Sequence, residues 1–246
     1  MTDFTPPLTR ATLLKRYKRF MADIRFSDGE EITVHVANPG SMMGLAEPGS
    51  TIYVQDSGNP KRKLRWSWQL ASGSPNNEPV VVNTGFANGL VETAIRNGHI
   101  PELAGYDTIR REVKYGENSR IDLLLEGAGK PPCYVEVKSV TLSRQPRLAE
   151  FPDSKTARGA KHLVELQNEV AKGHRAVMVY AAMRADCDGF RIAADIDPAY
   201  DKGLKEALAS GVERLCYAWA PSPNGIKLAT THPAFIDEGR ETAKTE

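Results

Sequence analysis

Two neighbouring stretches, SRIDLLLE at residues 119–126 and CYVEVKSVTL at residues 133–142, carry most of the information in this sequence. Both are rich in Val, Ile and Leu, which is typical of β-strands. Each has an acidic residue inside the apolar run, Asp122 in the first and Glu136 in the second. Lys138 follows Glu136 by two positions, so strand alternation places both side chains on one face. If the two strands form a hairpin, Asp122 lies close to Glu136.

The chemistry of these three side chains favours a metal site. Charges inside a sheet are costly unless they are paired or bound to a metal. Two converging carboxylates repel each other, and a divalent cation relieves that repulsion. Because oxygen ligands favour Mg²⁺ or Mn²⁺, we expect Asp122 and Glu136 to hold one of these ions and Lys138 to orient the attacking water. The alternative is that Glu136 and Lys138 form a cross-strand ion pair on a solvated face of the sheet.

The surrounding segments predict a mixed α/β domain with the element order αβββαβαβ. A short helix that ends at Gly98, with Asn88 as its cap, precedes the three strands. A longer helix is predicted after them, from Ser154 or Thr156 to Gly173, because its leucines form one stripe. The other predicted elements are strands over residues 112–116, 175–183 and 212–220 and a helix from Asp197 to Ser210.

This arrangement of Asp, a hairpin and then Glu-x-Lys resembles the PD-(D/E)xK nuclease-like superfamily, whose fold is that of restriction endonucleases. The resemblance implies catalytic roles for Asp122, Glu136 and Lys138. It also implies a further acid from the preceding helix, and Glu92 is placed to supply it. The alternative for Glu92 is an exposed helix residue with no part in the site.

The first third of the chain predicts a small barrel or sandwich of short strands. Apolar-rich runs at residues 18–26 and 30–36 flank Asp28-Gly29, which is a hairpin signal. In the run over residues 61–71, Trp66 and Trp68 share the apolar parity, so we expect both in the core. A turn-rich linker at residues 74–79 is expected to follow.

Three groups of basic residues are candidates for nucleic-acid binding. For the two groups in the first third of the chain, solvated surface is the alternative. Arg158 and Lys161 share one helix face with His162 and Glu165 and are placed to hold a phosphate. His162 is a candidate for assisting proton transfer, with a structural hydrogen bond as the alternative. The first two groups are Lys15, Arg16, Lys18 and Arg19, and Lys61, Arg62, Lys63 and Arg65.

The overall charge excludes a protein that finds a polyanion by bulk attraction. Its 32 Lys and Arg against 31 Asp and Glu give a net charge of +1, so any attraction must come from clustering. The sequence has no apolar run long enough to span a bilayer and no signal peptide, and its three cysteines form no CxxC motif. We therefore expect a cytoplasmic protein without membrane partners.

Seven further segments, in order along the chain, are informative: LLKRYKRFMADI, NPGSMMGL, VNTGFAN, YGENSRIDLLL, YVEVKSVTL, FPDSKTARGAKHLVEL and IDPAY. With these segments the chain resembles the sugar fermentation stimulation protein family. The resemblance implies an OB-fold-like domain over residues 1–82 and a PD-(D/E)xK-type domain over residues 83–236. Residues 237–246 are polar, so we expect a frayed tail there. The resemblance also implies DNA binding, single- or double-stranded, without strong sequence preference, and a regulatory link to sugar (maltose) metabolism. We expect a metal-dependent phosphodiesterase site, and the alternative is a non-catalytic DNA-binding regulator.

Overall fold

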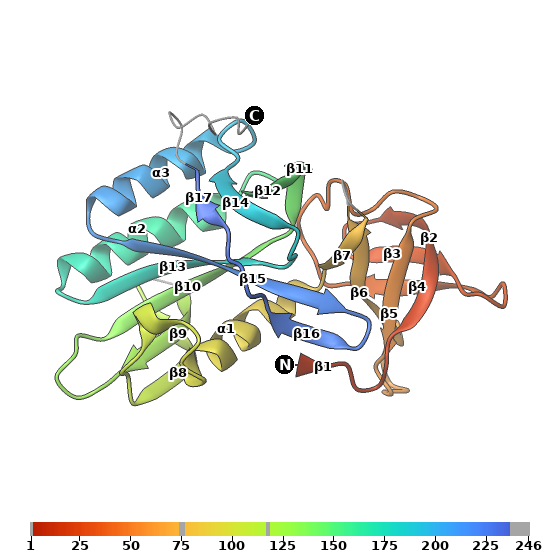
Figure 1. Ribbon diagram of the computed structural model, residues 1–246, viewed down its shortest axis with the longest axis horizontal. Coiled ribbons are helices and arrows are strands. Elements are labelled where there is room, and N and C mark those ends of the chain that lie inside the picture. The colour runs from red at the N-terminus through yellow and green to blue at the C-terminus, as the bar shows by residue number, and fades with distance from the viewer. Residues whose placement is uncertain (1, 74–76, 117–118, 237–246) are drawn as a thin grey trace.

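The structure, a computed structural model, describes residues 2–73, 77–116 and 119–236 (Figure 1). A small β-barrel from the N-terminal third stands beside a larger αβ domain (Figure 1). The mixed α/β fold class predicted from the sequence is confirmed. The predicted tail and the first three residues of the predicted linker lie outside the described residues.

The barrel consists of five strands that close on themselves, with a sixth strand added at one edge. Its sheet has the order β4-β3-β2-β5-β6-β7, and a parallel pairing of β4 with β6 closes the ring. Trp68 is fully buried in its core, as expected, and Trp66 packs half-buried against Phe26. The strands are β2 (Thr9–Tyr17), β3 (Met21–Arg25), β4 (Glu31–Val36), β5 (Thr51–Asp56), β6 (Trp66–Gly73) and β7 (Glu78–Val81).

The αβ domain is built on a seven-stranded sheet with the order β1-β16-β15-β13-β10-β9-β8. Its centre is parallel, because β10, β13 and β15 run in one direction, while β9 and β16 flank them antiparallel. The strands are β1 (Thr2–Asp3), β8 (Thr108–Tyr115), β9 (Ser119–Glu126), β10 (Cys133–Val140), β13 (Arg175–Ala182), β15 (Glu213–Ser222) and β16 (Gly225–Leu228).

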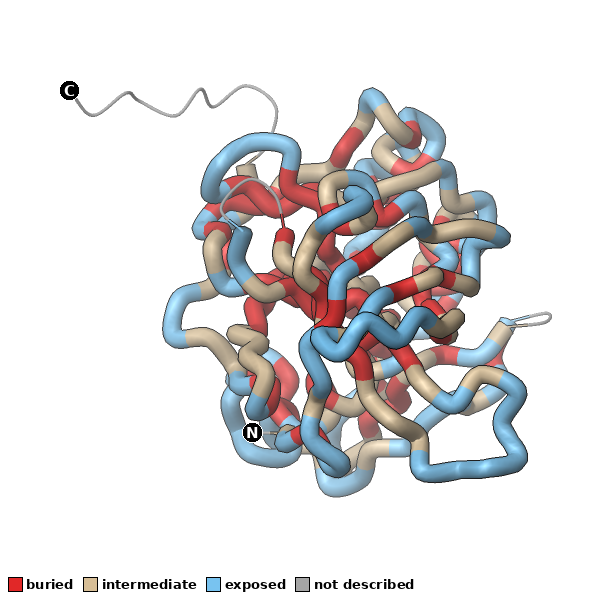
Figure 2. The backbone as a smooth tube through the Cα atoms, turned by 90° about the vertical axis from the view of Figure 1, so that its right-hand side faces the viewer, coloured by how far each residue is buried: buried red, intermediate tan, exposed pale blue. Residues whose placement is uncertain are grey.

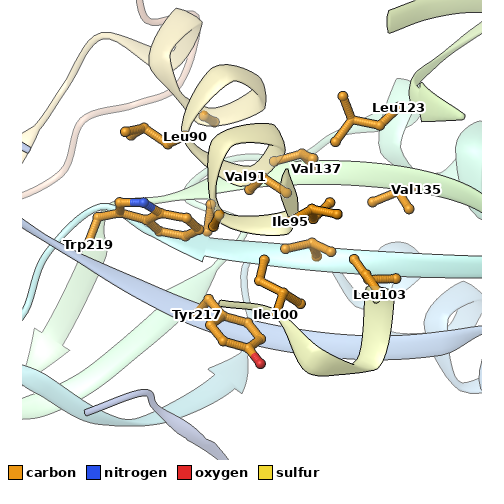
Figure 3. Close-up of a cluster of buried hydrophobic side chains, with 14 of the residues drawn as sticks. Leu90, Val91, Ile95, Ile100, Leu103, Leu123, Val135, Val137, Tyr217 and Trp219 are labelled. Atoms are coloured by element: carbon orange, nitrogen blue, oxygen red, sulfur yellow. The ribbon is translucent and has the colours of Figure 1, made fainter. Parts of the chain in front are cut away.

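One face of this sheet is covered by α1 (Ala87–Arg96), which follows the short 3-10 turn η1 (Thr84–Phe86). Figure 3 shows Leu90, Val91 and Ile95 of α1 directed at the sheet, with Trp219 beside them. The chain continues through a second 3-10 turn, η2 (Pro101–Leu103), into β8. This packing fixes α1 across the strands that carry the acidic residues.

The opposite face is covered by α2 (Ala157–Ala171) and α3 (Pro198–Ala209). Leu163 of α2 and Leu204 of α3 are buried against this face of the sheet. Both helices begin where the sequence predicts, because Thr156 and Asp197 cap them: the Asp197 carboxylate accepts from the backbone N–H groups of Tyr200 (3.0 Å) and Thr156 (2.7 Å). One aspartate therefore fixes the starts of both helices.

Several elements escape the sequence analysis. β2 is one of them, because its Lys and Arg residues hide the strand pattern. A four-stranded sheet of β11 (Leu142–Gln145), β12 (Arg147–Phe151), β14 (Cys187–Ile192) and β17 (Ala234–Phe235) is another. The strand predicted over residues 61–71 begins only at Trp66, and residues 78 and 79 of the predicted linker belong to the barrel strand β7. Asn88 does not cap α1, whose cap residue is Phe86.

The buried segments of the chain run through the interior of both parts, and exposed segments concentrate at the turns (Figure 2). The three cysteines are buried free thiols. Within the described ranges, no helix combines the length and the apolar character needed to cross a bilayer.

Candidate metal and nucleic-acid site

The site begins where β9 and β10 separate. Backbone pairing between them extends from Cys133 opposite Leu125 to Val135 opposite Leu123 and then ends. Beyond that point the side chain of Asp122 replaces the strand: its Oδ2 accepts the backbone N–H of Val137 at 2.7 Å. Its Oδ1 accepts from Asn88 Nδ2 of α1, also at 2.7 Å. The carboxylate is thus oriented from two sides.

Glu136 lies next to it, on β10, with 2% of its surface exposed. Lys138 Nζ donates to Glu136 Oε1 at 2.6 Å, and His162 Nδ1 of α2 contacts the same oxygen. His162 Nε2 accepts from Arg158 Nε at 3.3 Å, so Nδ1 carries the proton that His162 shares with Glu136. Lys138 and His162 therefore meet at one oxygen of Glu136, and Arg158 supports His162 from behind.

The two carboxylates differ in electrostatic environment. Burial, reinforced by the charge of Glu136, raises the pKa of Asp122 to about 6. Burial also disfavours the charge of Glu136, but Lys138 and His162 outweigh it and hold the pKa of Glu136 below its ordinary value. The site therefore holds one firmly ionised carboxylate, Glu136, beside Asp122, which ionises less readily because it is buried and lies next to that charge.

Two observations test whether these residues suit a divalent cation. Glu136 Oε2 is buried and has no hydrogen-bond partner among the described residues, so a strong acceptor is left free beside Asp122. Three His, Cys, Asp or Glu side chains do not converge on one point anywhere in the described ranges, which disfavours a closed protein cage. Mg²⁺ retains several waters and is commonly held by one or two carboxylates. The pair Asp122 and Glu136 fits that ion.

The site borders a cleft of about 900 Å³ between the barrel and the αβ domain, and Lys138 is one of the residues that line this cleft. The loop over residues 38–41 forms its barrel side, and residues 150–158, ending in the first turn of α2, form the other. The amino end of a helix favours anions because its N–H groups point outward. The cations that line the cleft are Arg16, Arg19, Lys138, Lys155 and Arg158.

Of the two acids on the cleft, Glu150 is neutralised by two arginines and Asp153 is hydrogen-bonded to the barrel. Glu150 has a fully buried side chain and accepts from Arg144 Nη2 at 2.7 Å and Arg191 Nη2 at 2.9 Å. Asp153 accepts the backbone N–H of Met42 at 3.0 Å, and its carbonyl accepts from Ser41 Oγ at 2.7 Å. Asp153 thereby joins the 38–43 loop of the barrel to the αβ domain. The electrostatic character of the cleft is consequently basic.

Glu92, the acid expected from the preceding helix, does not approach Asp122 through any described contact. Arg96, one turn later on α1, donates to one of its oxygens at 2.8 Å, and Arg111 of β8 pairs with the other. Two arginines outweigh its burial and keep the pKa of Glu92 below its ordinary value. These pairs favour the alternative for Glu92, a helix residue outside the site, and Asn88, one turn earlier, is the residue of α1 with a described hydrogen bond to Asp122.

The first basic cluster divides into inward and outward members. Arg16 is turned inward and donates to the carbonyls of Arg19, Asn38, Gly40 and Ser41 at 2.8–2.9 Å, which favours a structural role over the predicted DNA contact. Lys15 pairs with Asp23 at 3.2 Å. Lys18 and Arg19 form an exposed turn with φ angles of +47° and +63°, and Arg19 reaches the cleft.

The second cluster lies away from the cleft. Lys61, Arg62 and Lys63 are exposed on the loop between β5 and β6, and Arg65 pairs with Asp56. These residues do not line the cleft. On α2, Arg158 lines the cleft and supports His162, whereas Lys161 lies 3.6 Å from Glu165 and is not part of the cleft lining.

Two residues of the site were missed from the sequence. Asn88 was interpreted as a helix cap, the ordinary role of an Asn before an apolar stripe. Lys155 is an exposed cation of the cleft, in the segment before α2. Only the motif FPDSKTARGAKHL, in which Lys155 stands four residues after Phe151, could have indicated it.

Comparisons with known proteins agree with this architecture. Residues 85–225 match the family described as Sugar fermentation stimulation protein RE domain, and residues 14–82 match SfsA N-terminal OB domain. A Sugar fermentation stimulation protein homolog of Paramagnetospirillum magneticum is 57% identical, covering 92% of this chain and 94% of the relative. A homolog of Rhodospirillum centenum is 56% identical, covering 93% and 97%.

Among solved structures, Pyrococcus furiosus SfsA in complex with Ca²⁺ superposes with a TM-score of 0.84 at 26% identity, covering 96% of this chain and all of that one.

Proposed function

Because the chain belongs to the sugar fermentation stimulation protein family, we propose that it binds DNA without strong sequence preference and hydrolyses phosphodiester bonds with a divalent cation. The observation that carries the proposal is the position of Asp122, Glu136 and Lys138. They lie together at the end of a split hairpin, where Lys138 opens into a basic cleft. A structural sheet has no need of this arrangement.

Each residue has a definable task in the proposed reaction. Asp122 and Glu136 hold Mg²⁺ or Mn²⁺, which when bound neutralises charge on the phosphate and lowers the pKa of water. Lys138 is 15% exposed, and its ammonium lies 2.6 Å from Glu136, where it orients the attacking water. His162 positions Glu136 and does not transfer a proton, since both of its ring nitrogens are engaged.

The cleft supplies the binding part of the proposal. Arg19 projects from the barrel side and Lys155 and Arg158 from the other side, so a phosphate backbone in the cleft contacts both domains. Asn88 orients Asp122 from α1, in the way that outer hydrogen bonds orient metal ligands. The Pyrococcus furiosus relative is in complex with Ca²⁺, which takes oxygen ligands as Mg²⁺ does.

The test is cleavage of labelled single- and double-stranded DNA and RNA by the purified full chain with Mg²⁺, Mn²⁺ or EDTA. Asp122→Asn and Lys138→Met are the active-site variants. Glu126→Gln is the matched control, because this acid is on the same strand as Asp122 but pairs with Arg110 at the surface. We expect metal-dependent cleavage that Asp122→Asn and Lys138→Met reduce at least about 100-fold and the control preserves.

Binding without cleavage under every metal would overturn the catalytic part and leave the non-catalytic DNA-binding regulator. Equal cleavage by the wild type and Asp122→Asn would trace the activity to a contaminant. Affinity for DNA that does not fall as salt rises would contradict the phosphate contacts, because each such contact releases counterions.

A further inference from the structure

A group of polar atoms without partners lies beside the metal-binding pair. Six buried side-chain atoms lack a hydrogen-bond partner within the described ranges, and four of them belong to Tyr115, Glu136 and Glu165. These side chains come from β8, β10 and α2 and are 7%, 2% and 6% exposed. Buried polar atoms are normally hydrogen-bonded, so their concentration in one place requires an explanation.

Three contacts bring these residues together. His162, which contacts Glu136, lies three residues before Glu165, so both project from one face of α2. A Cβ atom at Gly116 would lie 2.7 Å from Glu165 Oε1, so the carboxylate rests against the end of β8, directly after Tyr115. The Tyr115 ring packs 5.7 Å from that of Tyr134, two residues before Glu136 on β10.

Protein groups leave the charge of Glu165 largely uncompensated. Its described cationic neighbour, Lys161 Nζ, lies 3.6 Å from Oε1, too far for a hydrogen bond, and is half-exposed. Glu169, one turn later, shows what compensation looks like on this helix: it accepts from Lys172 at 2.7 Å and contacts His174 Nδ1 at 2.8 Å. A buried carboxylate without such partners is unfavourable unless a cation or a proton joins it.

We propose that Glu165, with the hydroxyl of Tyr115 and the free oxygen of Glu136, holds a second divalent cation. All its ligands are oxygens, which selects Mg²⁺, Mn²⁺ or Ca²⁺ over Zn²⁺. Glu136 is shared with the first ion, since a carboxylate offers about four lone-pair positions. This inference deepens the proposed function and rests on it, because the second ion lies beside the one held by Asp122 and Glu136.

The test counts Mn²⁺ ions bound to the full chain by electron paramagnetic resonance of free Mn²⁺, without any substrate. The variants are Glu165→Gln and Tyr115→Phe, and Glu169→Gln is the matched control. We expect two ions in the wild type and in Glu169→Gln, and one ion in Glu165→Gln. Tyr115→Phe is expected to lower the affinity for the second ion about tenfold or more.

Melting temperatures in EDTA provide an independent readout. Glu165→Gln is expected to melt at or above the wild-type temperature, because it removes an uncompensated buried charge, whereas Glu169→Gln melts lower because it loses two partners. One Mn²⁺ in both wild type and Glu165→Gln would overturn this inference and leave the first site intact. Two ions in Glu165→Gln would also overturn it, and no ion in the wild type would overturn the proposed function with it.

Discussion

Arg16→Ala is expected to destabilise the barrel without removing a DNA contact. The Arg16 guanidinium holds two partly buried carbonyls, those of Asn38 and Gly40, each at 2.9 Å. It also holds the more exposed carbonyls of Arg19 and Ser41. Water can replace the arginine at the exposed pair but less readily at the buried pair. At about 1.5 kcal/mol for each buried charge-assisted bond, the free energy of unfolding falls by about 3 kcal/mol.

The assay is urea denaturation followed by tryptophan fluorescence, with Lys18→Ala as control. Lys18 is exposed on the same turn, so its removal is expected to change the stability by no more than about 0.5 kcal/mol. Arg16→Lys is expected to restore little, because an ammonium lacks the planar fork that reaches several carbonyls. Suppose instead that Arg16→Ala keeps its stability but lowers the salt slope of DNA binding by about one; Arg16 would then contact a phosphate and the reasoning here would fail.

Other predictions follow from single contacts. Asn88→Ala frees Asp122 Oδ1 and is expected to slow single-turnover cleavage about 10–100-fold with little change in melting temperature. Glu92→Gln, by contrast, is expected to change the rate of cleavage by no more than about twofold, because the oxygens of Glu92 pair with arginines. A loss of rate comparable to that of Asp122→Asn would show that Glu92 acts in the site. Glu150→Gln is expected to cost about 3 kcal/mol in urea denaturation at pH 7. The arginines lower the pKa of Glu150 despite its burial. The stability that Glu150 contributes is therefore present above its unfolded pKa of about 4.3 and is lost as pH falls through the lower folded pKa. If the variant lost stability in acid as steeply as the wild type, this explanation would be contradicted.

Local patterns in the sequence predict the parts of the fold that depend on neighbouring residues. The helix caps at Thr156 and Asp197 and the Asp28-Gly29 turn are examples, since each is set by a few adjacent side chains. The small sheet of β11, β12, β14 and β17 could not be predicted in this way. Its strands are short, and β12, β14 and β17 pair across about forty residues of chain each time, so no period within one segment marks them.

The site divides along the same line. Glu136 and Lys138 share a face because they are two apart on one strand, and the sequence shows that directly. The choice between Asn88 and Glu92 on α1 depends on which turn of the helix crosses the separated strands and on Arg111 arriving from β8. Both of these positions are determined by tertiary packing, which the local sequence does not show. The inward direction of Arg16 likewise depends on carbonyls more than twenty residues away.

The net charge of +1 does not measure the attraction of the cleft for DNA. The cleft contains two acids, of which Glu150 is paired with arginines, while Arg19, Lys138, Lys155 and Arg158 line the cleft on two sides. Four phosphate contacts on duplex DNA predict a slope of log affinity against log salt of about −3.6, from about 0.9 for each contact. Fluorescence anisotropy from low to physiological salt measures this slope. A slope steeper than about −6 would mean that the distant loop of Lys61, Arg62 and Lys63 also contacts the duplex, and the binding surface would have to extend beyond the cleft.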